Sequence, residues 1–285
     1  MSDSGTDYDV IVVGGGPSGA TAAHEIALAG HKVLLLERAF RIKPCGGAIP
    51  PCILGEFDIP RSLLKAEIQS ARMISPKAQK VDMPIEGTFV GMVDRDEFDP
   101  WLRLRAQRAG ADLELATFKK VEYIDKTMLR VTYVSKDQNT ETRTATARCV
   151  LGADGARSQV AKQSIPKHAD VPWVLAYHEI VEAPRAATEG YDPERCEVWY
   201  QGDLSPDFYA WVFPHGKSTS IGVGSAYKDF SARKSVNELR AISGLDTAET
   251  IRKEGAPIPM KPMKRWDDGR ALLVSGDAAG VVAPA

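Results

Sequence analysis

The sequence predicts an α/β fold in which a parallel sheet with a βαβ start is interleaved with an antiparallel sheet. Three observations lead to this prediction. Two short apolar runs, Tyr8–Val13 and Lys32–Glu37, flank a stretch of helix-forming residues, in the order of a βαβ unit. Several strand-like runs follow one another between residues 174 and 226, as in an antiparallel sheet. A last apolar run, Leu272–Val274, indicates one more buried strand.

The first elements follow from the positions of apolar and small residues. Tyr8–Val13 is β-branched and apolar, as expected of a strand that is buried on both faces. Ala20–Ala29 is rich in small residues and helix formers, and Gly30 ends the predicted helix. Lys32–Glu37 is then the second strand of the βαβ unit.

The middle of the chain is predicted to contain a long loop, a helix and several short strands. Residues 38–60 are rich in proline and glycine, which predicts a long loop with a functional role. Glu97–Arg108 is predicted to be an amphipathic helix. Further strands are predicted at Leu113–Thr117, Met128–Val134 and Arg148–Leu151.

Composition excludes several classes of protein. The chain has 285 residues, of which 44% are hydrophobic and 26% charged, and its net charge of −2 provides no field for binding nucleic acid. The first residues lack the pattern of a signal peptide, and no apolar run approaches the length of a spanning helix, about 20 residues. We therefore expect a cytoplasmic protein, with peripheral association with a membrane left open. The four cysteines lie far apart, so neither a metal site nor a disulfide framework is expected.

A glycine motif lies between the first strand and the first helix. Gly14, Gly16 and Gly19 have the spacing that lets a backbone approach a pyrophosphate at a helix N-terminus. Glu37 ends the second strand, 23 residues after Gly14, where a carboxylate accepts hydrogen bonds from a ribose. The alternative is a plain glycine-rich turn. The pattern predicts a Rossmann-like dinucleotide site, and the neighbouring Ser18 and Arg38 are included in it.

Two Asp-Gly segments lie at later strand ends. Asp154-Gly155 lies within GADGARS, and Gly276-Asp277 lies within GDAAG. A carboxylate beside a glycine offers an acceptor for a hydroxyl and an unobstructed backbone, although each segment alone could be a simple turn. In this order the segments make the chain resemble the para-hydroxybenzoate hydroxylase-like flavoproteins, which implies that FAD is the cofactor.

Arg95 is the next residue that this resemblance marks. It stands in the segment from Val93 to Leu102, at the expected start of a helix, where the family's arginine reaches the FAD phosphates. The guanidinium group suits a phosphate. The alternative is a solvated surface arginine.

Within that group the chain is similar to the geranylgeranyl reductases of chlorophyll and bacteriochlorophyll synthesis, over essentially its whole length. The Tyr-x-Trp-x-Phe-Pro segment and the later Gly222-x-Gly224 match a signature of prenyl reductases and are the most specific part of the resemblance. The stretches that carry the resemblance are Lys43–Pro50, Ala71–Pro76, Ala176–Ile180 and Ser205–Pro214 with Gly222 and Gly224.

The aromatic residues of this signature alternate along a predicted strand. Tyr209, Trp211 and Phe213 therefore project from one face, where they and Pro214 could wall an apolar channel for an isoprenoid substrate. The same face could equally be packed core.

The Cys45-Gly46-Gly47 segment lies in the loop after the second strand, which the resemblance places beside the isoalloxazine ring. Its glycines would allow a close backbone approach, and Cys45 would shape the site or take part in protonation. The alternatives are a buried small residue and a turn. His178 and Glu179 fall in a predicted strand and are candidate proton donors, but a structural role is the commoner one for such residues.

The resemblance implies a reductase that uses NADPH and FAD to saturate the double bonds of a geranylgeranyl group. Its substrate would be a prenylated pigment, that is a bacteriochlorophyll or chlorophyll ester, or the free prenyl diphosphate. Two other functions stay open: an FAD-dependent aromatic hydroxylase, and a prenyl-binding escort protein without redox activity.

The predicted domains alternate along the chain. Family members continue beyond the last Gly-Asp segment, so a fragment that binds flavin weakly is expected. The FAD-binding domain is predicted at residues 1–75, 93–160 and 270–285, with a substrate-domain insertion at 76–92 and an antiparallel-sheet substrate domain at 161–269.

Overall fold

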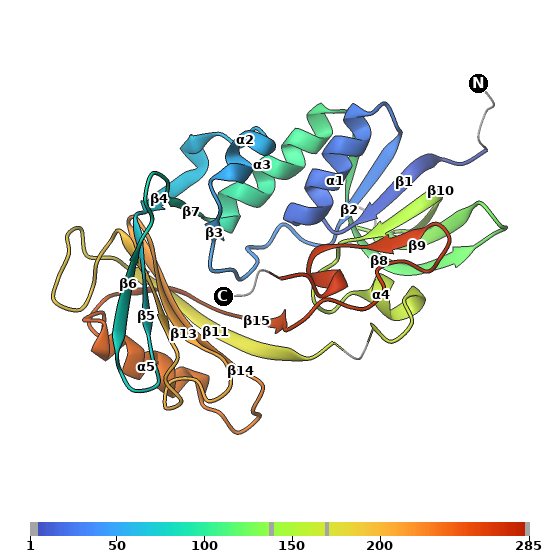
Figure 1. Cartoon of the computed structure of the whole chain (residues 1–285). Coiled ribbons are helices and arrows are strands. Elements are labelled where there is room, and N and C mark those ends of the chain that lie inside the picture. Colours follow the sequence, from blue (N-terminus) through green and yellow to red (C-terminus); the bar gives the residue numbers. More distant parts are fainter. Residues whose placement is uncertain (1–4, 137–139, 169–170, 283–285) are drawn as a thin grey trace. The chain divides into compact units, whose positions relative to one another are not determined.

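The computed structural model describes residues 5–136, 140–168 and 171–282, and the chain forms two compact units (Figure 1). The chain crosses from one unit to the other four times. The first unit comprises residues 1–41, 99–173 and 258–285, and the second unit comprises 42–98 and 174–257.

Four neighbouring parallel strands form the core of the first unit. In this layer β1 lies between β2 and β10, and β16 lies on the other side of β10. All five residues of β2 are buried, and so are the last three of β1, because both faces of the layer are covered. The bounds are Tyr8–Val13 for β1, Val33–Glu37 for β2, Thr142–Gly152 for β10 and Leu272–Val274 for β16.

Two of the strands in the first unit run beyond the parallel layer. β8 (Asp112–Tyr123) starts parallel to β2 and continues as an antiparallel partner of β9 (Leu129–Ser135), which also pairs with the first half of β10. The sequence predicted only short parts of β8 and β10. Their outer halves contain lysines and threonines, which obscure the apolar strand pattern.

The helices of the first unit begin at its glycine-rich turns. α1 starts at Pro17, directly after the extended Gly16, and proline is well suited to a first helical position. The predicted start at Ala20 is three residues too late, because Pro17, Ser18 and Gly19 of the glycine motif are already helical. Gly30 follows α1 with a φ of 86°. The bounds are Pro17–Leu28 for α1, Gln159–Ser164 for α4 and Gly276–Ala279 for the 3-10 helix η3; α3, Arg95–Arg108, runs from the second unit into the first.

The second unit is built on a seven-stranded sheet, in the order β15-β11-β14-β13-β12-β5-β6. The pair β12–β5 is parallel, whereas β11, β14, β13 and β12 are joined by antiparallel pairs, as are β5 and β6. The predicted antiparallel sheet is therefore confirmed, with one parallel pair within it. The bounds are Thr250–Pro259 (β15), Trp173–Glu182 (β11), Ser218–Ser225 (β14), Ala210–His215 (β13), Arg195–Trp199 (β12), Ser70–Ile74 (β5) and Lys80–Pro84 (β6).

One helix covers one face of this sheet. α5 (Ala232–Ile242) lies along β14, and its Val236 and Leu239 are buried against Val212 and Ile221 (Figure 1). Because side chains alternate along a strand, the neighbouring residues of β13 point to the opposite face. A small sheet completes the unit, with β3 (Ala48–Ile49), β7 (Val90–Val93) and β4 (Leu64–Ile68); α2 (Cys52–Glu56) and the 3-10 helix η1 (Arg61–Leu63) lie in the same part of the chain.

The bounds of the compact units differ from the predicted domain bounds. Residues 42–75 belong to the second unit, because β4 pairs with β7 and β5 pairs with β12. Residues 161–173 and 258–269 belong to the first unit, where α4 contacts β8 and β16. Strand pairing thus assigns parts of one predicted domain segment to different compact units.

In residues 5–136, 140–168 and 171–282, no helix has both the length and the apolar character needed to cross a bilayer.

Candidate functional site

The three glycine motifs of the first unit, residues 14–19, 152–155 and 276–280, lie together at one edge of its sheet. Each motif follows the carboxyl end of a parallel strand, β1, β10 or β16, and these strands are neighbours. Ligands of open α/β sheets bind at this edge. The structure therefore brings the predicted cofactor residues of the first unit to one place.

Glycine is required where the first two motifs meet. Gly14 has a φ of 106°, and a Cβ there would lie 2.3 Å from the backbone oxygen of Ala153. A Cβ on Gly19 would lie 1.9 Å from the oxygen of Gly14. Neither distance is compatible with a side chain, so the two motifs pack backbone against backbone.

A pair of serines joins the first motif to the third. The hydroxyl groups of Ser18 and Ser275 lie 2.7 Å apart. Gly276, with a φ of 61°, packs so closely on Ser18 that a Cβ would lie 3.0 Å from the Cβ of the serine. Asp277 lies in the first turn of η3 and is exposed.

Glu37 is buried at the end of β2, with 3% of its surface exposed. Its Oε2 accepts a hydrogen bond from the backbone N–H of Gly15 at 2.7 Å, and its Oε1 accepts one from Ala39 at 3.0 Å. The carboxylate thus fixes the turn of the first motif. The side chain of the next residue, Arg38, is exposed, and its backbone oxygen accepts a hydrogen bond from Lys136.

Arg103 is a buried residue of this region that the sequence did not single out. It donates from Nη1 to the backbone oxygen of Gly15 at 3.0 Å, and its guanidinium group lies over the ring of Phe40. Glu37 and Arg103 therefore hold the same glycine, one at its N–H and the other at its oxygen. Arg103 is one of several arginines in α3, and no spacing distinguishes it.

The carboxylate of Asp154 is directed to the start of α4. Its Oδ2 accepts hydrogen bonds from the backbone N–H groups of Gln159 at 2.6 Å and Val160 at 3.3 Å, and its Oδ1 accepts one from the hydroxyl of Ser158. Burial raises the pKa of Asp154, and these hydrogen bonds oppose the rise. The contacts give this carboxylate a capping role.

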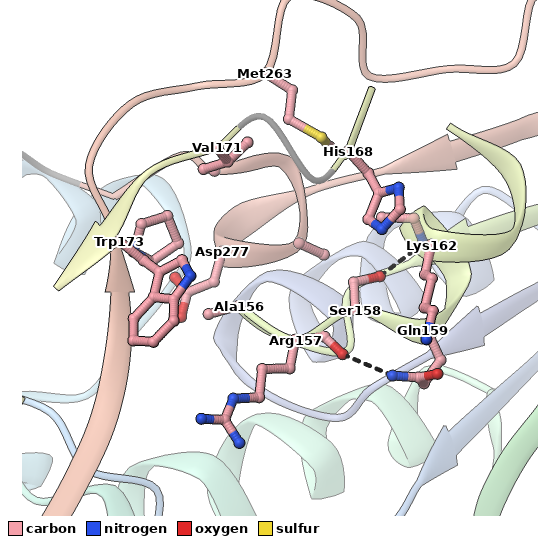
Figure 2. Close-up of a pocket in the computed structure, with 14 residues that line it drawn as sticks. Ala156, Arg157, Ser158, Gln159, Lys162, His168, Val171, Trp173, Met263 and Asp277 are labelled. Atoms are coloured by element: carbon pink, nitrogen blue, oxygen red, sulfur yellow. Dashed lines mark hydrogen bonds between the residues drawn. The ribbon is translucent and has the colours of Figure 1, made fainter. Parts of the chain in front are cut away.

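A pocket of about 320 Å³ lies beside α4 in the first unit (Figure 2). Arg157 and Lys162 contribute cationic groups to its wall, together with His168, Trp173 and Asp277. Cationic side chains beside an aromatic ring suit an anionic ligand. Of these five residues the sequence analysis had named only Asp277.

In the second unit the aromatic residues of the signature form a continuous row along β13. The ring centroids of Tyr209 and Trp211 are 5.9 Å apart, and those of Trp211 and Phe213 are 6.3 Å apart. The three residues, called the aromatic row below, lie on the face of the sheet opposite α5. Burial, with smaller contributions from Tyr200 and Cys45, raises the pKa of Tyr209 to about 12.

The two glycines of the signature lie under aromatic rings. A Cβ on Gly222 would be 2.4 Å from the indole of Trp211, and one on Gly224 would be 2.5 Å from the ring of Phe208. The Gly-x-Gly spacing therefore allows the rings to pack closely on β14. This is a packing explanation for a pattern that the sequence analysis noted only as part of a resemblance.

The Cys45–Gly47 loop runs over the aromatic row. A Cβ on Gly46 would be 3.1 Å from the ring of Phe213, and one on Gly47 would be 2.4 Å from Cε1 of His215. Gly47 also has a φ of 77°. Two segments that are about 165 residues apart in the sequence thus form one surface.

His178 and Glu179 point to opposite faces of β11, and both are buried. His178 lies 2.9 Å from the hydroxyl of Ser220, which accepts a hydrogen bond from the indole of Trp211, and its Nε2 lies 3.0 Å from the carboxylate of Glu254. The carboxylate of Glu179 is held by Arg240 at 2.7 Å, together with Lys253 and Tyr177. Both residues are buried next to polar or charged neighbours, which agrees with a structural role.

Arg95 is the first residue of α3 and belongs to the second unit. Its side chain is half-buried. Pro214 is buried in β13, between the aromatic row and His215.

The cysteines are all free thiols. Cys45 and Cys52 are exposed, and Cys196 is buried. Burial raises the pKa of Cys196 to about 12, so its thiol is un-ionised. No cluster of three or more metal-binding side chains occurs within the part of the chain that the structure describes.

Comparisons with known proteins agree on one group. Residues 8–188 match the family described as Pyridine nucleotide-disulphide oxidoreductase. A geranylgeranyl diphosphate reductase of Rhodobacter capsulatus is 55% identical over 278 residues, which cover 97% of this chain and 70% of the relative. The chloroplastic geranylgeranyl diphosphate reductase of Oryza sativa is 38% identical over 294 residues, which cover 98% of this chain and 62% of the relative.

A solved structure is similar over the same length. The crystal structure of a geranylgeranyl bacteriochlorophyll reductase-like protein from Thermoplasma acidophilum aligns with a TM-score of 0.86 and 26% identity, over 96% of this chain and 72% of that one. The chain therefore spans between 62% and 72% of the length of these relatives.

Proposed function

Because the chain belongs to the geranylgeranyl diphosphate reductase family of FAD-dependent oxidoreductases, we propose that it saturates the double bonds of a geranylgeranyl group, with NADPH as the source of electrons. The product would carry a phytyl group. Since the relatives are longer than this chain, the activity of the whole reductase is part of the proposal.

The glycine motifs of the first unit fit the FAD that the family implies. The turn before α1 consists of glycines that carry no side chains of their own, so phosphate groups could approach the positive end of that helix. Glu37 closes the turn at the end of β2, and Asp277 offers an exposed carboxylate next to Gly276. We propose that Gly14, Gly16, Ser18, Gly19, Glu37, Arg38, Asp154, Gly155, Gly276 and Asp277 form the cofactor site, and that Arg95 contacts the phosphates.

One observation carries the proposed substrate class. The aromatic row is continuous along β13 and is covered by the Cys45–Gly47 loop, so aromatic rings and glycine backbone form one apolar surface. An isoprenoid chain has no polar group to place there except at its head. We propose that Tyr209, Trp211, Phe213 and Pro214 wall the path of the prenyl chain.

In the proposed reaction the cofactor supplies the chemistry, and the residues of the protein position the substrate. The chemistry that bound FAD would supply is the transfer of a hydride, taken from NADPH, to one carbon of the double bond, while a proton adds to the other carbon. The aromatic row would hold the alkene and exclude water. The Cys45–Gly47 loop would bring backbone rather than side chains close to the reacting bond.

Two substrates fit this site: a geranylgeranyl ester of a bacteriochlorophyll or chlorophyll, and free geranylgeranyl diphosphate. We propose the pigment ester, in keeping with a role in bacteriochlorophyll or chlorophyll synthesis, and with substrate supplied from the surface of a photosynthetic membrane. The free diphosphate is the competing substrate in the experiment below.

The proposal is tested by anaerobic visible spectroscopy of the purified chain with FAD. NADPH should bleach the flavin band, and geranylgeranyl-bacteriochlorophyll should restore it without oxygen. Phe213→Leu should slow only the second step, since it changes the wall of the prenyl path, whereas Tyr227→Ala, an exposed aromatic outside the row, should change neither step. Recovery that requires oxygen would favour a hydroxylase. Recovery with geranylgeranyl diphosphate alone would favour the free substrate.

A further inference from the structure

His215 follows the aromatic signature directly and lies beneath the Cys45–Gly47 loop. Its ring is 6% exposed and touches two oxygen atoms. Nδ1 lies 2.7 Å from Oδ1 of Asp94, and Nε2 lies 3.0 Å from the backbone oxygen of Gly46. The histidine therefore connects the end of β13 to the loop and to the residue before α3.

Both partners of the ring are hydrogen-bond acceptors. A backbone carbonyl only accepts hydrogen bonds, and so does an ionised carboxylate. Burial alone would raise the pKa of Asp94, but the hydrogen bond and charge of His215, with the charges of Lys65 and Arg252, hold the pKa below its usual range. Asp94 is thus ionised, and each ring nitrogen of His215 faces an oxygen atom that only accepts hydrogen bonds.

Other charged groups near this contact balance one another. Lys65 forms a salt bridge with Glu97, and Arg252 forms one with Glu254. Asp94 is the carboxylate that contacts the histidine ring directly.

The loop is held at neighbouring points. The backbone oxygen of Gly47 accepts a hydrogen bond from Val93 at 2.9 Å, and the next residues form β3, which pairs with β7. The oxygen of Gly46 is held by the histidine side chain. A Cβ on Gly47 would overlap the ring, so the loop closes over the histidine only because glycine stands there.

We infer that His215 is a positioning residue whose ring, anchored by Asp94, fixes the backbone of the Cys45–Gly47 loop against the aromatic row. The contact with Gly46 sets how far Cys45 stands from Tyr209 and Phe213. The effect of this contact on prenyl reduction rests on the proposed function, whereas its effect on the loop does not.

Two substitutions separate the two contacts of the ring. The amide nitrogen of asparagine occupies the position of Nδ1, so His215→Asn keeps the contact with Asp94 and loses the one with Gly46. The amide nitrogen of glutamine occupies the position of Nε2, so His215→Gln keeps a donor for Gly46. A residue with only a general packing role would respond similarly to both changes.

The readout is the rate of hydrogen exchange at the backbone N–H groups of residues 45–49, followed by mass spectrometry. His215→Asn should raise the rate about tenfold, because the hydrogen bond that holds the oxygen of Gly46 is lost, while His215→Gln should stay within about threefold. His31→Asn, which changes an exposed histidine of the first unit, should have no effect.

The result that would overturn the inference is an equal rate for the parent and His215→Asn, or equal increases for both His215 variants. If His215→Asn fails to fold, the comparison of His215→Gln with Gly47→Ala replaces it. Gly47→Ala pushes the loop off an intact histidine and should raise the rate more than His215→Gln. Hydrogen exchange needs neither flavin nor prenyl substrate, so it distinguishes a failure of the loop contact from a failure of the proposed function.

Discussion

At the residue scale, Gly222 shows how a missing side chain shapes the candidate site. Its Cα lies under the indole of Trp211, and the Cβ of His178 is on its other side, 2.5 Å from where a glycine Cβ would stand. Both neighbours are buried, so neither is free to move away. The close packing of Trp211 on β14 thus requires that position 222 carries no side chain.

Gly222→Ala should therefore destabilise the second unit by about 2 kcal/mol, the usual cost of overpacking a buried site. It should also shift the fluorescence of Trp211, because the ring must tilt. Gly202→Ala is the matched control: nothing lies within 4 Å of the position of its Cβ, and we expect a change below about 0.5 kcal/mol. Urea titrations followed by tryptophan fluorescence measure both. Equal stability of the two variants would contradict this explanation of the Gly-x-Gly spacing.

At the element scale, α4 depends on a cap that couples it to a glycine motif. Ser158 is its N-cap residue and accepts a hydrogen bond from the N–H of Ala161 at 2.8 Å, while its hydroxyl donates to Asp154. A helix of six residues has few hydrogen bonds of its own. The cap therefore has a large share in keeping this helix in place.

Ser158→Ala should cost about 1 kcal/mol and lower the hydrogen-exchange protection of α4 roughly fivefold. The chain offers a close control, because Ser231 is the N-cap residue of α5 but makes no side-chain capping bond. Ser231→Ala should leave the protection of α5 unchanged. Exchange of the two helices, followed by mass spectrometry, gives both results in one sample. A loss of protection in α5 but not in α4 would contradict the assigned caps.

The elements differ in how well the sequence predicts them. β1, β2 and β16 are short and apolar, and each was predicted within one residue, although Leu273 in β16 is exposed. The outer halves of β8 and β10 carry polar residues, and their strand character comes from pairing with β9 rather than from apolar pattern. Such pairing is a tertiary effect and has no local signal.

The same limit applies to the candidate site. The glycine motifs were recognisable because each has a fixed local spacing. Arg103 and His215 were not, because each holds a backbone oxygen far away in the sequence, 88 and 169 residues distant respectively. Residues that act through distant backbone atoms become visible only when the fold is known.

At the scale of the whole molecule, the direction in which the pKa of partly buried carboxyl groups shifts differs between the two units. Asp94, Glu179 and Glu254 all belong to the second unit, and in each case burial would raise the pKa but cationic or hydrogen-bonding neighbours lower it. Asp154, in the first unit, has a raised pKa because burial dominates. The two units should therefore respond differently to acid.

The sign follows from linkage. A carboxyl group with a lowered pKa in the folded state adds stability above its ordinary pKa, and this stability is lost as the pH falls through the lowered value. Asp154 has the opposite sign, since its proton is held more tightly in the folded state. Below about pH 4, where ordinary carboxyl groups titrate, the second unit should lose stability before the first.

Hydrogen exchange at stepwise lower pH, with labelling times scaled to the chemical exchange rate, measures this order directly. β11, β13 and β14 should lose protection before β1, β2 and β10. Glu179→Gln should remove about 3 kcal/mol at neutral pH, because Arg240 loses its buried partner, and should flatten the acid dependence of the second unit. Glu122→Gln, at an exposed ion pair of the first unit, should leave the order unchanged. Earlier loss of protection in β1 and β2 would mean that other groups control acid unfolding.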